Sequence, residues 1–312
     1  MKKLSVIIPC YRSEKTLASV VDEIRNTIRQ RNEYRYQIVL VDDNSPDEVY
    51  NVIKRLCADD QALVGVKLSR NFGQQSALLA GQSLADGEII ICLDDDGQSP
   101  ADKLYDLIDK LEQGFDAVFA KYNRKSQTLF RRFGSWMNLK MTELLLDKPK
   151  GVEFSSFFAV KKFVSDEMIK YTNPFPYNVG LILSVTRKIS NVDCEHRKRI
   201  DGKSGYTFFK LLSVWLNGFT AFSIKPLRFV SYLGLITAFF GFGYGLYIVA
   251  RKLIDIHYVV IGWSSLMAIY LFLSGVIMFM LGFTGEYVSR IYTSINKTPQ
   301  YVITEILKND HL

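Results

Sequence analysis

The sequence predicts an α/β domain built on a parallel, doubly wound sheet and followed by two membrane-spanning helices. Over residues 4–120, short runs rich in Val and Ile alternate with segments whose apolar residues recur at helical spacing, as strands and crossover helices do. Further along, residues 229–250 and 258–285 contain no charged side chain. As a helix, the first stretch would be about 33 Å long, enough to cross a hydrocarbon core of about 30 Å.

Short apolar runs and helical spacing locate the elements of the first part. Five strands are expected, at residues 4–9, 37–41, 64–68, 88–93 and 116–120. The helices between them are expected at residues 13–31, from the turn at 42–46 to residue 58, at 72–85, and from Pro100 onward. At the last of these helices, Ser99 is expected as the N-cap, and Asp102 completes a pattern like a capping box.

The pattern is looser after residue 121. A basic amphipathic helix is expected over residues 127–146, a strand over 154–160, and helices over 163–171 and 179–188. Residues 205–222 carry aromatic and aliphatic side chains with few charges, which predicts an amphipathic helix in the membrane interface. An ordinary core helix is the alternative for this segment.

These patterns divide the chain into four parts. We expect a cytosolic α/β domain over residues 1–204, an interface helix and linker over 205–228, two transmembrane helices over 229–285 (229–250 and 259–284), and a cytosolic tail over 286–312. Basic residues are in excess outside the loop between the spans, which predicts cytoplasmic termini. The short apolar run at the N-terminus does not fit a signal peptide.

Composition narrows the class of protein further. The four cysteines form no C-x-x-C pair, so they fit reduced thiols rather than a disulfide framework or a zinc site. A net charge of +7 suits a protein beside anionic lipid. The basic residues are spread along the chain and no nucleic-acid-binding motif occurs, so nucleic acid is not expected as a partner.

Three consecutive carboxylates, Asp94, Asp95 and Asp96, end the expected fourth strand. They repel one another, and a divalent cation such as Mg²⁺ or Mn²⁺ would relieve the repulsion. On an extended segment Asp94 and Asp96 share a face while Asp95 points away. We therefore expect Asp96 as the direct metal ligand and Asp94 as a partner to the metal or to a ribose. A solvated acidic turn before the helix at Pro100 is the alternative.

The ends of the neighbouring strands point to a nucleotide. Asp42 and Asp43 can accept hydrogen bonds from a base or a ribose, and Tyr11, after Pro9, can stack on a base. No glycine-rich loop follows the first strand and no G-x-x-x-x-G-K-[ST] motif occurs. These absences argue against a nicotinamide or flavin oxidoreductase and against a P-loop NTPase. A diphosphate would then have to be held by a metal, which the acidic cluster could bind.

Several motifs together resemble those of one enzyme family. VIIPCY, LVDDNSPD, LSRNFGQQSALLAG and LDDDGQSP are similar to successive motifs of inverting family 2 glycosyltransferases with the GT-A fold. With KSGY, IKPLR and GEYVSRIY further along, nearly the whole chain resembles the polyprenyl-phosphate glycosyltransferases, a group that includes the bactoprenol glucosyltransferases and dolichyl-phosphate mannose synthase-like enzymes. The two spans and the GEYVSRIY tail point to the bacterial membrane-anchored branch.

The resemblance implies roles for matching positions. Residues implied to bind the nucleotide sugar are Pro9, Tyr11, Glu14, Asp42, Asp43, Arg70, Asn71, Asp94 and Asp95. Those implied in catalysis are Asp94, Asp96, Gln98 and Arg124, with Asp96 and Asp94 holding Mg²⁺ or Mn²⁺. Those implied to meet the acceptor phosphate are Arg124, Arg131, Arg199 and Lys203. For Arg131, a merely solvated or lipid-facing charge on a basic helix is the alternative.

The chain also departs from the family pattern. Gly97 and Gln98 follow the acidic cluster where relatives usually have a small residue and then Leu. Residues 153–157 replace a Gly-Asp-Phe-Arg-like stretch, so a carboxylate that would orient the acceptor is missing or displaced to Glu153. Gly205 stands where relatives often have Lys, for which Lys203 would compensate.

The resemblance implies transfer of a hexosyl unit from a nucleotide diphosphate sugar, with UDP favoured, to a polyprenyl phosphate, with undecaprenyl phosphate favoured. The reaction would take place at the cytoplasmic membrane face and serve a cell-envelope glycan such as the lipopolysaccharide O-antigen; relatives form homo-oligomers. A phosphate monoester is mostly dianionic at neutral pH, so the attack needs no strong base. The alternatives are a processive polysaccharide synthase, a non-catalytic membrane assembly subunit and a cytosolic transferase. The first lacks its Q-x-x-R-W motif here, and the spans disfavour the last.

Overall fold

The computed structural model describes residues 1–31, 33–122, 149, 151–174, 176–195, 197, 225–254, 262–296 and 298–308. The chain forms two compact units. The first comprises Met1–Gly218 and Lys297–Leu312, and the second comprises Phe219–Asn296. The expected helices over residues 127–146 and 205–222 lie outside the described residues.

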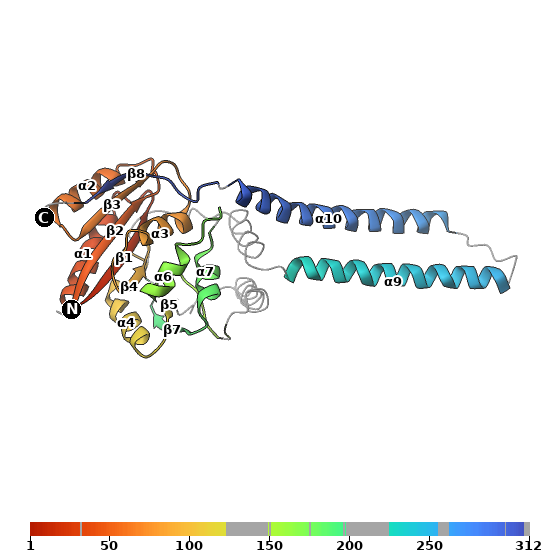
Figure 1. Cartoon of the computed structure of the whole chain (residues 1–312), viewed down its shortest axis with the longest axis horizontal. Coiled ribbons are helices and arrows are strands. Elements are labelled where there is room, and N and C mark those ends of the chain that lie inside the picture. The colour runs from red at the N-terminus through yellow and green to blue at the C-terminus, as the bar shows by residue number, and fades with distance from the viewer. Residues whose placement is uncertain are drawn as a thin grey trace. The chain divides into compact units, whose positions relative to one another are not determined.

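An eight-stranded sheet with the order β7-β5-β6-β4-β1-β2-β3-β8 forms the centre of the first unit (Figure 1). Its strands are β1 (Lys2–Cys10), β2 (Tyr34–Asp42), β3 (Leu63–Leu68), β4 (Ile89–Cys92), β5 (Ala117–Tyr122), β6 (Phe158–Lys161), β7 (Ile189–Cys194) and β8 (Ile303–Leu307). β1 to β4 are mutually parallel, whereas β6 runs antiparallel to β4 and β5, and β8 antiparallel to β3. The predicted doubly wound, mainly parallel sheet is therefore confirmed.

Helices connect the strands, as the sequence predicts. They are α1 (Leu17–Arg29), α2 (Val49–Asp59), α3 (Gln74–Gln82), the 3₁₀ turn η1 (Ala101–Lys103), α4 (Leu104–Glu112), α6 (Lys162–Met168) and α7 (Asn178–Val185). The buried side of α1 carries Leu17, Val20, Val21, Ile24 and Ile28, the stripe that helical spacing predicts. β1 lies in the middle of the sheet and is buried from Leu4 to Cys10, because a parallel strand covered on both faces needs apolar residues throughout.

Helix α3 packs closely against the sheet. A Cβ atom at Gly81 would lie 2.3 Å from Ile7 Cγ2, so a larger residue could not sit there without displacing β1. The helix is buried from Ser76 to Gln82. This packing fixes the position of the helix's first residue, Gln74, at the edge of the sheet.

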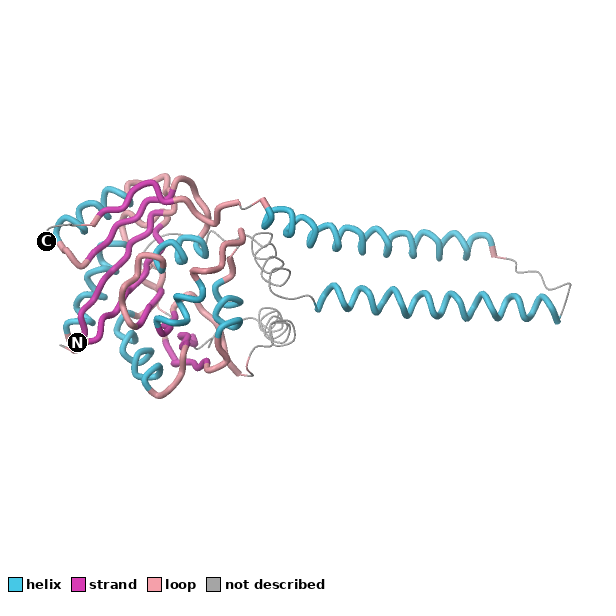
Figure 2. Tube along the Cα trace, in the orientation of Figure 1, coloured by secondary structure: helices cyan, strands magenta, loops and turns pink. Residues whose placement is uncertain are grey.

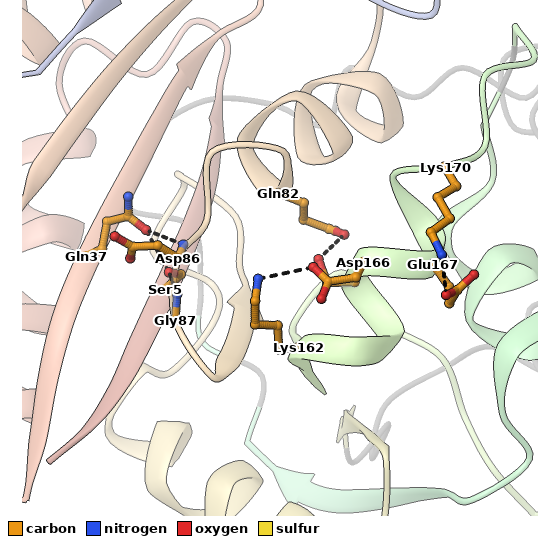
Figure 3. Close-up of polar contacts among 10 residues, drawn as sticks. Ser5, Gln37, Gln82, Asp86, Gly87, Lys162, Asp166, Glu167 and Lys170 are labelled. Carbon is orange, nitrogen blue, oxygen red and sulfur yellow. Dashed lines mark hydrogen bonds and ion pairs between the residues drawn. The ribbon is translucent and has the colours of Figure 1, made fainter.

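Buried polar side chains tie the segment before β4 to the neighbouring strands (Figure 3). Ser5 Oγ donates to Gln37 Oε1 over 2.7 Å and accepts from the backbone N–H of Gly87 over 2.9 Å. Gln82 accepts from Ser165 Oγ over 3.0 Å. Each of these buried groups has a partner, as a stable interior requires. The contacts therefore hold α3, β4 and α6 in a fixed relation to the central strands.

Three sequence predictions need correction in this unit. Ser99 does not cap the helix: η1 has Pro100 as its N-cap with no side-chain hydrogen bond, and Ser99 Oγ instead lies 3.4 Å from the Tyr122 hydroxyl oxygen. β6 begins at Phe158 rather than 154, because Ser155 Oγ donates to the Phe157 carbonyl and bends the chain before the strand. The helix expected to reach residue 188 ends at Val185, and β7 follows.

The second unit consists of two long helices, α9 (Lys225–Ile254) and α10 (Trp263–Ile295), which Figure 2 shows side by side. They approach closely where a Cβ atom at Gly234 would lie 3.6 Å from Met280 Cε. Many of their large apolar side chains are exposed, with Phe239 75% and Phe272 70% accessible. Within the described residues, one segment, Phe272–Ile295, is long and apolar enough to cross a membrane, and Gly234–Tyr247 forms a shorter apolar helix.

After α10 the chain returns to the first unit, where β8 completes the sheet. The Ser69 N–H donates to the Val302 carbonyl over 2.9 Å, and Gln300 Nε2 donates to the carbonyls of Tyr171 and Asn173. Leu307 packs against the core, 3.1 Å from the position of a Cβ at Gly65. The predicted tail over residues 286–312 did not include this strand.

Removal of residues 302–312 is expected to lower the melting temperature by several degrees. The deletion exposes the edge of β3 and removes the packing of Leu307, and a loss of 1 kcal/mol corresponds to about 2–4 °C in a unit of this size. Thermal unfolding of the purified protein in detergent measures the shift. Lys170→Gln, which removes an exposed ion pair with Glu167, should change the melting temperature by less than about 1 °C. An unchanged melting temperature in the deletion variant would show that β8 contributes no stability.

Candidate active site

The carboxyl ends of β1 to β4 meet at one edge of the sheet, because these four strands are parallel neighbours. The loops at this edge carry most of the predicted site residues that the structure describes. Arg124, Arg131, Arg199 and Lys203 lie outside the described residues, so their predicted acceptor-binding role stays a prediction.

The acidic cluster after β4 is held from two sides. Asp94 accepts hydrogen bonds from Gln74 Nε2 over 2.6 Å and from Ser156 Oγ. Asp96 Oδ1 accepts from the backbone N–H of Gln98 over 3.0 Å. Asp94 is thus fixed between the start of α3 and the segment before β6, while Asp96 closes a local turn.

Asp95 has other partners than Asp94, and the segment turns at Asp95 and Asp96 instead of continuing as an extended strand. Its carboxylate accepts from the Tyr11 N–H over 3.0 Å, and its carbonyl accepts from Thr16 Oγ1 over 2.7 Å. Burial raises the pKa of the Asp95 carboxyl above its ordinary value, although the hydrogen bond from the Tyr11 N–H favours the ionised form. Asp95 therefore joins the loop after β4 to the loop after β1.

Asp43 organises the loop that carries Arg70 and Asn71. Its carboxylate is only 3% exposed and accepts from the backbone N–H groups of Phe72, over 2.7 Å, and Gly73, over 2.8 Å. Gly73 has a φ of 89°, which favours glycine, and α3 begins at the next residue. Burial raises the pKa of Asp43 to about 6. The carboxylate thus acts as a clamp for the turn between β3 and α3.

The raised pKa of Asp43 predicts a pH dependence of stability. Between the ordinary value of 3.8 and about 6, the folded chain holds more protons at Asp43 than the unfolded chain does. Asp43 therefore makes the free energy of unfolding fall as the pH rises through that window. Above the folded-state pKa the carboxyl is ionised in both states, and its destabilising effect has reached its full size. Urea unfolding at pH 4 to 7 should show this slope in the wild type relative to Asp43→Asn, which cannot titrate. If the difference in the free energy of unfolding between wild type and Asp43→Asn did not change with pH, the raised pKa of Asp43 would be contradicted.

Asp42 and Glu14 also bind the chain itself. Asp42 is 1% exposed, and its Oδ1 accepts from the Ser45 N–H over 2.8 Å. Glu14 Oε2 accepts from the N–H of Glu48, just before α2, over 3.1 Å. Both residues therefore shape the loops after β1 and β2. Direct contact of Asp42, Asp43 and Glu14 with a nucleotide stays a prediction.

Two non-glycine residues with left-handed backbones lie at this edge. Arg12 has a φ of 58° and Asn44 a φ of 49°, and the Arg12 N–H donates to Ser45 Oγ over 2.8 Å. Such conformations are uncommon and persist where surrounding contacts enforce them, often at functional sites. The loops after β1 and β2 are therefore locked against each other in a specific shape.

The groups that remain accessible at the edge are aromatic and basic. Tyr11 is 43% exposed with the Arg12 guanidinium 5.5 Å from its ring centroid, and Arg70, also exposed, stands 4.5 Å from the Phe72 ring centroid. Asn71 is exposed as well, whereas Pro9 is buried within β1 opposite Val41. An aromatic face beside guanidinium groups suits a base and a phosphate. Pro9 shapes the strand end instead of offering a surface.

Sequence analysis missed three residues that support this site. Gln74 and Ser156 bind Asp94 but lie 20 and 62 residues away from it in the chain, so spacing could not reveal them. Arg197 pairs with Glu23 and Asp102 over 2.6 Å each, and its carbonyl accepts from Gln98 Nε2 over 3.4 Å. Their contacts arise from the tertiary fold. The one sequence feature that pointed to any of them was the unusual stretch at 153–157, which contains Ser156, a hydrogen-bond donor to Asp94.

The acidic cluster fits a hard divalent cation in its chemistry. Asp94 and Asp96 supply oxygen ligands, and Mg²⁺ commonly takes one or two carboxylates and completes its shell with phosphate oxygens and water. Among the described residues, no group of three or more His, Cys, Asp or Glu side chains is arranged to hold a metal alone. The two carboxylates would therefore leave positions on such an ion open to other oxygen ligands.

Comparison with protein-family models identifies the family of this chain. Residues 5–169 match the model of glycosyl transferase family 2, and residues 225–291 match the GtrB C-terminal hairpin. The chain belongs to glycosyltransferase family 2. Along the chain, the first match extends from β1 to α6, and the second covers α9 and most of α10. This family 2 glycosyltransferase is thus an enzyme with a C-terminal helical hairpin, and the resemblance noted from the sequence motifs is confirmed.

Individual relatives align over almost the whole chain. The uncharacterized glycosyltransferase YkcC of Bacillus subtilis (strain 168) is 30% identical, over 96% of this chain and 92% of its own length. The undecaprenyl-phosphate 4-deoxy-4-formamido-L-arabinose transferase of Shewanella sediminis (strain HAW-EB3) is 30% identical over 97% and 92%. The prophage bactoprenol glucosyl transferase homolog of Escherichia coli (strain K12) is 30% identical over 98% and 100%.

Solved structures share the fold of the first unit. Glucosyl-3-phosphoglycerate synthase from Mycobacterium tuberculosis, in complex with Mn²⁺ and UDP-glucose, aligns with a TM-score of 0.52 over 69% of this chain and 76% of its own. Sequence identity is 17%, so the likeness is one of fold. It agrees with the mixed sheet described above.

Proposed function

We propose that this family 2 glycosyltransferase moves a hexosyl unit, with inversion, from a UDP-linked sugar to a polyprenyl phosphate, undecaprenyl phosphate in bacteria. The observation that carries the proposal is the acidic cluster at the sheet edge of a chain that also contains a helical hairpin. The names of two relatives, an undecaprenyl-phosphate transferase and a bactoprenol glucosyl transferase homolog, support the lipid acceptor. The product would serve the synthesis or modification of a cell-envelope glycan such as the lipopolysaccharide O-antigen.

Each part of the site contributes to binding the donor. Tyr11 stacks on the uracil base, and Arg70 meets a phosphate. Asp94 and Asp96 would hold Mg²⁺ or Mn²⁺, which neutralises charge on the departing diphosphate. The clamp at Asp43 keeps Arg70 and Asn71 in place, and the bond between Gln74 and Asp94 fixes the acidic cluster before the substrate arrives.

The acceptor acts as its own nucleophile. Its phosphate has a second pKa of about 6, so it is mostly dianionic at neutral pH and needs no general base. One phosphate oxygen forms a bond to the anomeric carbon as the bond from that carbon to the diphosphate oxygen breaks, and no proton is transferred. The enzyme supplies positioning and charge complementarity.

The hairpin would keep the enzyme at the lipid headgroup. We propose that α9 and α10 both span the membrane and leave both termini in the cytoplasm. The exposed apolar side chains of both helices and the sequence excess of Lys and Arg outside the loop between them support this topology. The product would then form on the cytoplasmic leaflet.

The proposal is tested with purified full-length protein in detergent, radiolabelled nucleotide sugars and undecaprenyl phosphate. Label should enter the organic phase with at least one UDP-sugar, and excess chelator should prevent it. Turnover that is equal with and without lipid phosphate would show a hydrolase instead. No turnover of any nucleotide sugar would favour the non-catalytic assembly subunit.

A further inference from the structure

One buried carboxamide has no hydrogen-bond partner among the described residues. Asn178, the first residue of α7, is 2% exposed, and among the described residues neither its Oδ1 nor its Nδ2 finds a hydrogen-bond partner. Burial of an amide without partners costs free energy, so such a group calls for an explanation. Something outside the described chain is expected to bind it.

The state of Asn178 differs from that of other buried polar groups. Gln82, also 2% exposed, accepts from Ser165 Oγ over 3.0 Å (Figure 3). The buried hydroxyls of Ser13 and Tyr50 also lack a hydrogen bond of good geometry. Each of them nevertheless interacts with a nearby carboxylate, Ser13 with Asp95 and Tyr50 with Glu305. No such group compensates the Asn178 amide in the described structure.

Asn178 is linked to the acidic cluster through the start of α3. Its backbone N–H donates to Gln75 Oε1 over 3.0 Å, and the neighbouring Gln74 donates to Asp94 Oδ1 over 2.6 Å. The N-cap residue of α7, Tyr177, makes no side-chain cap bond. The helix start with its unpartnered amide therefore lies beside the helix start that fixes Asp94; Figure 1 shows α3 and α7 in the same part of the unit.

The chemistry of the group selects the ligand. A carboxamide is neutral and offers two donors and an acceptor, which complement a hydroxyl group that both donates and accepts. A phosphate would only accept and would favour a cation such as Arg. Gln75, which accepts from the Asn178 N–H, and its chain neighbour Gln74 are neutral too. A neutral polar subsite next to the acidic cluster suits a sugar ring.

We propose that Asn178 is a specificity-determining residue that hydrogen-bonds a hydroxyl or an acylamino group of the transferred sugar. This inference rests on the proposed function, because it assumes a nucleotide sugar bound at the acidic cluster. Asn178 is buried before binding, and its desolvation cost is offset when the correct sugar pairs with it. A sugar lacking the matching group leaves the amide unpaired and is rejected, as buried polar sites reject incomplete ligands.

The test compares sugar selectivity in binding, which needs no lipid. Dissociation constants of UDP, UDP-glucose, UDP-galactose, UDP-N-acetylglucosamine and GDP-mannose are measured by calorimetry on the full-length protein in detergent. In Asn178→Leu, of similar size, the ratio between the best and the worst sugar should shrink about tenfold, the loss of one good hydrogen bond. The affinity for UDP itself should stay within about twofold, and the melting temperature of the ligand-free variant should not fall.

Gln82→Leu is the matched control, since it removes a buried carboxamide that has a partner. This variant should lower the melting temperature and keep the wild-type ratio. Unchanged selectivity in Asn178→Leu together with a lower melting temperature would overturn the inference and indicate a bound water. A wild type that does not discriminate among the sugars would overturn it as well. If the wild type discriminates but passes no sugar to undecaprenyl phosphate, the proposed function fails, and the binding ratios alone decide the role of Asn178.

Discussion

Replacement of Asp96 by Ala is expected to reduce sugar transfer by a factor on the order of 10³, the effect of removing a principal electrostatic contact from an active site. Asp96 is partly exposed, and its side chain accepts a hydrogen bond from the Gln98 N–H that closes a local turn. Its removal should therefore cost little stability. Initial rates with a UDP-sugar and undecaprenyl phosphate, together with the melting temperature, measure both expectations.

A surface carboxylate provides the control for Asp96→Ala. Asp166 pairs with Lys162 over 3.1 Å on the exposed side of α6, where Figure 3 shows the pair, and Asp166→Ala should leave transfer within about twofold of wild type. Full activity of Asp96→Ala, or of the wild type in excess chelator, would remove the divalent ion from the mechanism. A large loss of melting temperature would instead give Asp96 a structural role.

Asp43→Ala is expected to lower both stability and activity, with transfer falling by roughly a hundredfold. The variant leaves the N–H groups of Phe72 and Gly73 without their acceptor in a buried place, and hydrogen bonds to a charged group are worth about 1.5–3 kcal/mol each. The turn that carries Arg70 and Asn71 would then lose its fixed shape. Thermal unfolding and steady-state kinetics on the same preparation check the two effects.

Asp43→Asn distinguishes the hydrogen bonds that Asp43 accepts from the effect of its negative charge. The amide keeps one acceptor oxygen, so this variant should lose less activity than Asp43→Ala. Equal activity in wild type and Asp43→Ala would show that the turn holds its shape without the carboxylate. A lower melting temperature with normal rates in the folded protein would restrict Asp43 to stability.

The parts of the fold that local sequence determines could be predicted. β1 to β5 and the helices between them carry dense apolar patterns, and the acidic cluster is contiguous in the chain, so both were recognisable. β7 was missed because its sequence, ISNVDC, is polar for a strand at the end of a sheet. β8 was missed because it is short and largely exposed, and its partner β3 lies far away in the chain.

The same distinction holds for the site. Asp94 and Asp96 could be recognised from their spacing in the sequence. Gln74 and Ser156 contact Asp94 only because of the packing of α3 and the bend before β6. Contact of Asp42 and Asp43 with the nucleoside stays a prediction. Their hydrogen bonds to backbone N–H groups of the loops could not be predicted, because they depend on how the loops fold beside the strand ends.

The antiparallel pairing of β3 with β8 has a consequence for biosynthesis. While the ribosome is still synthesising the hairpin, the nascent catalytic sheet ends at β3, with one edge unpaired. Closure of that edge waits for β8, which is synthesised after both long helices. The sheet is therefore completed only once the helical hairpin has been made, so a truncated chain released early would carry an exposed edge for chaperones and proteases to recognise.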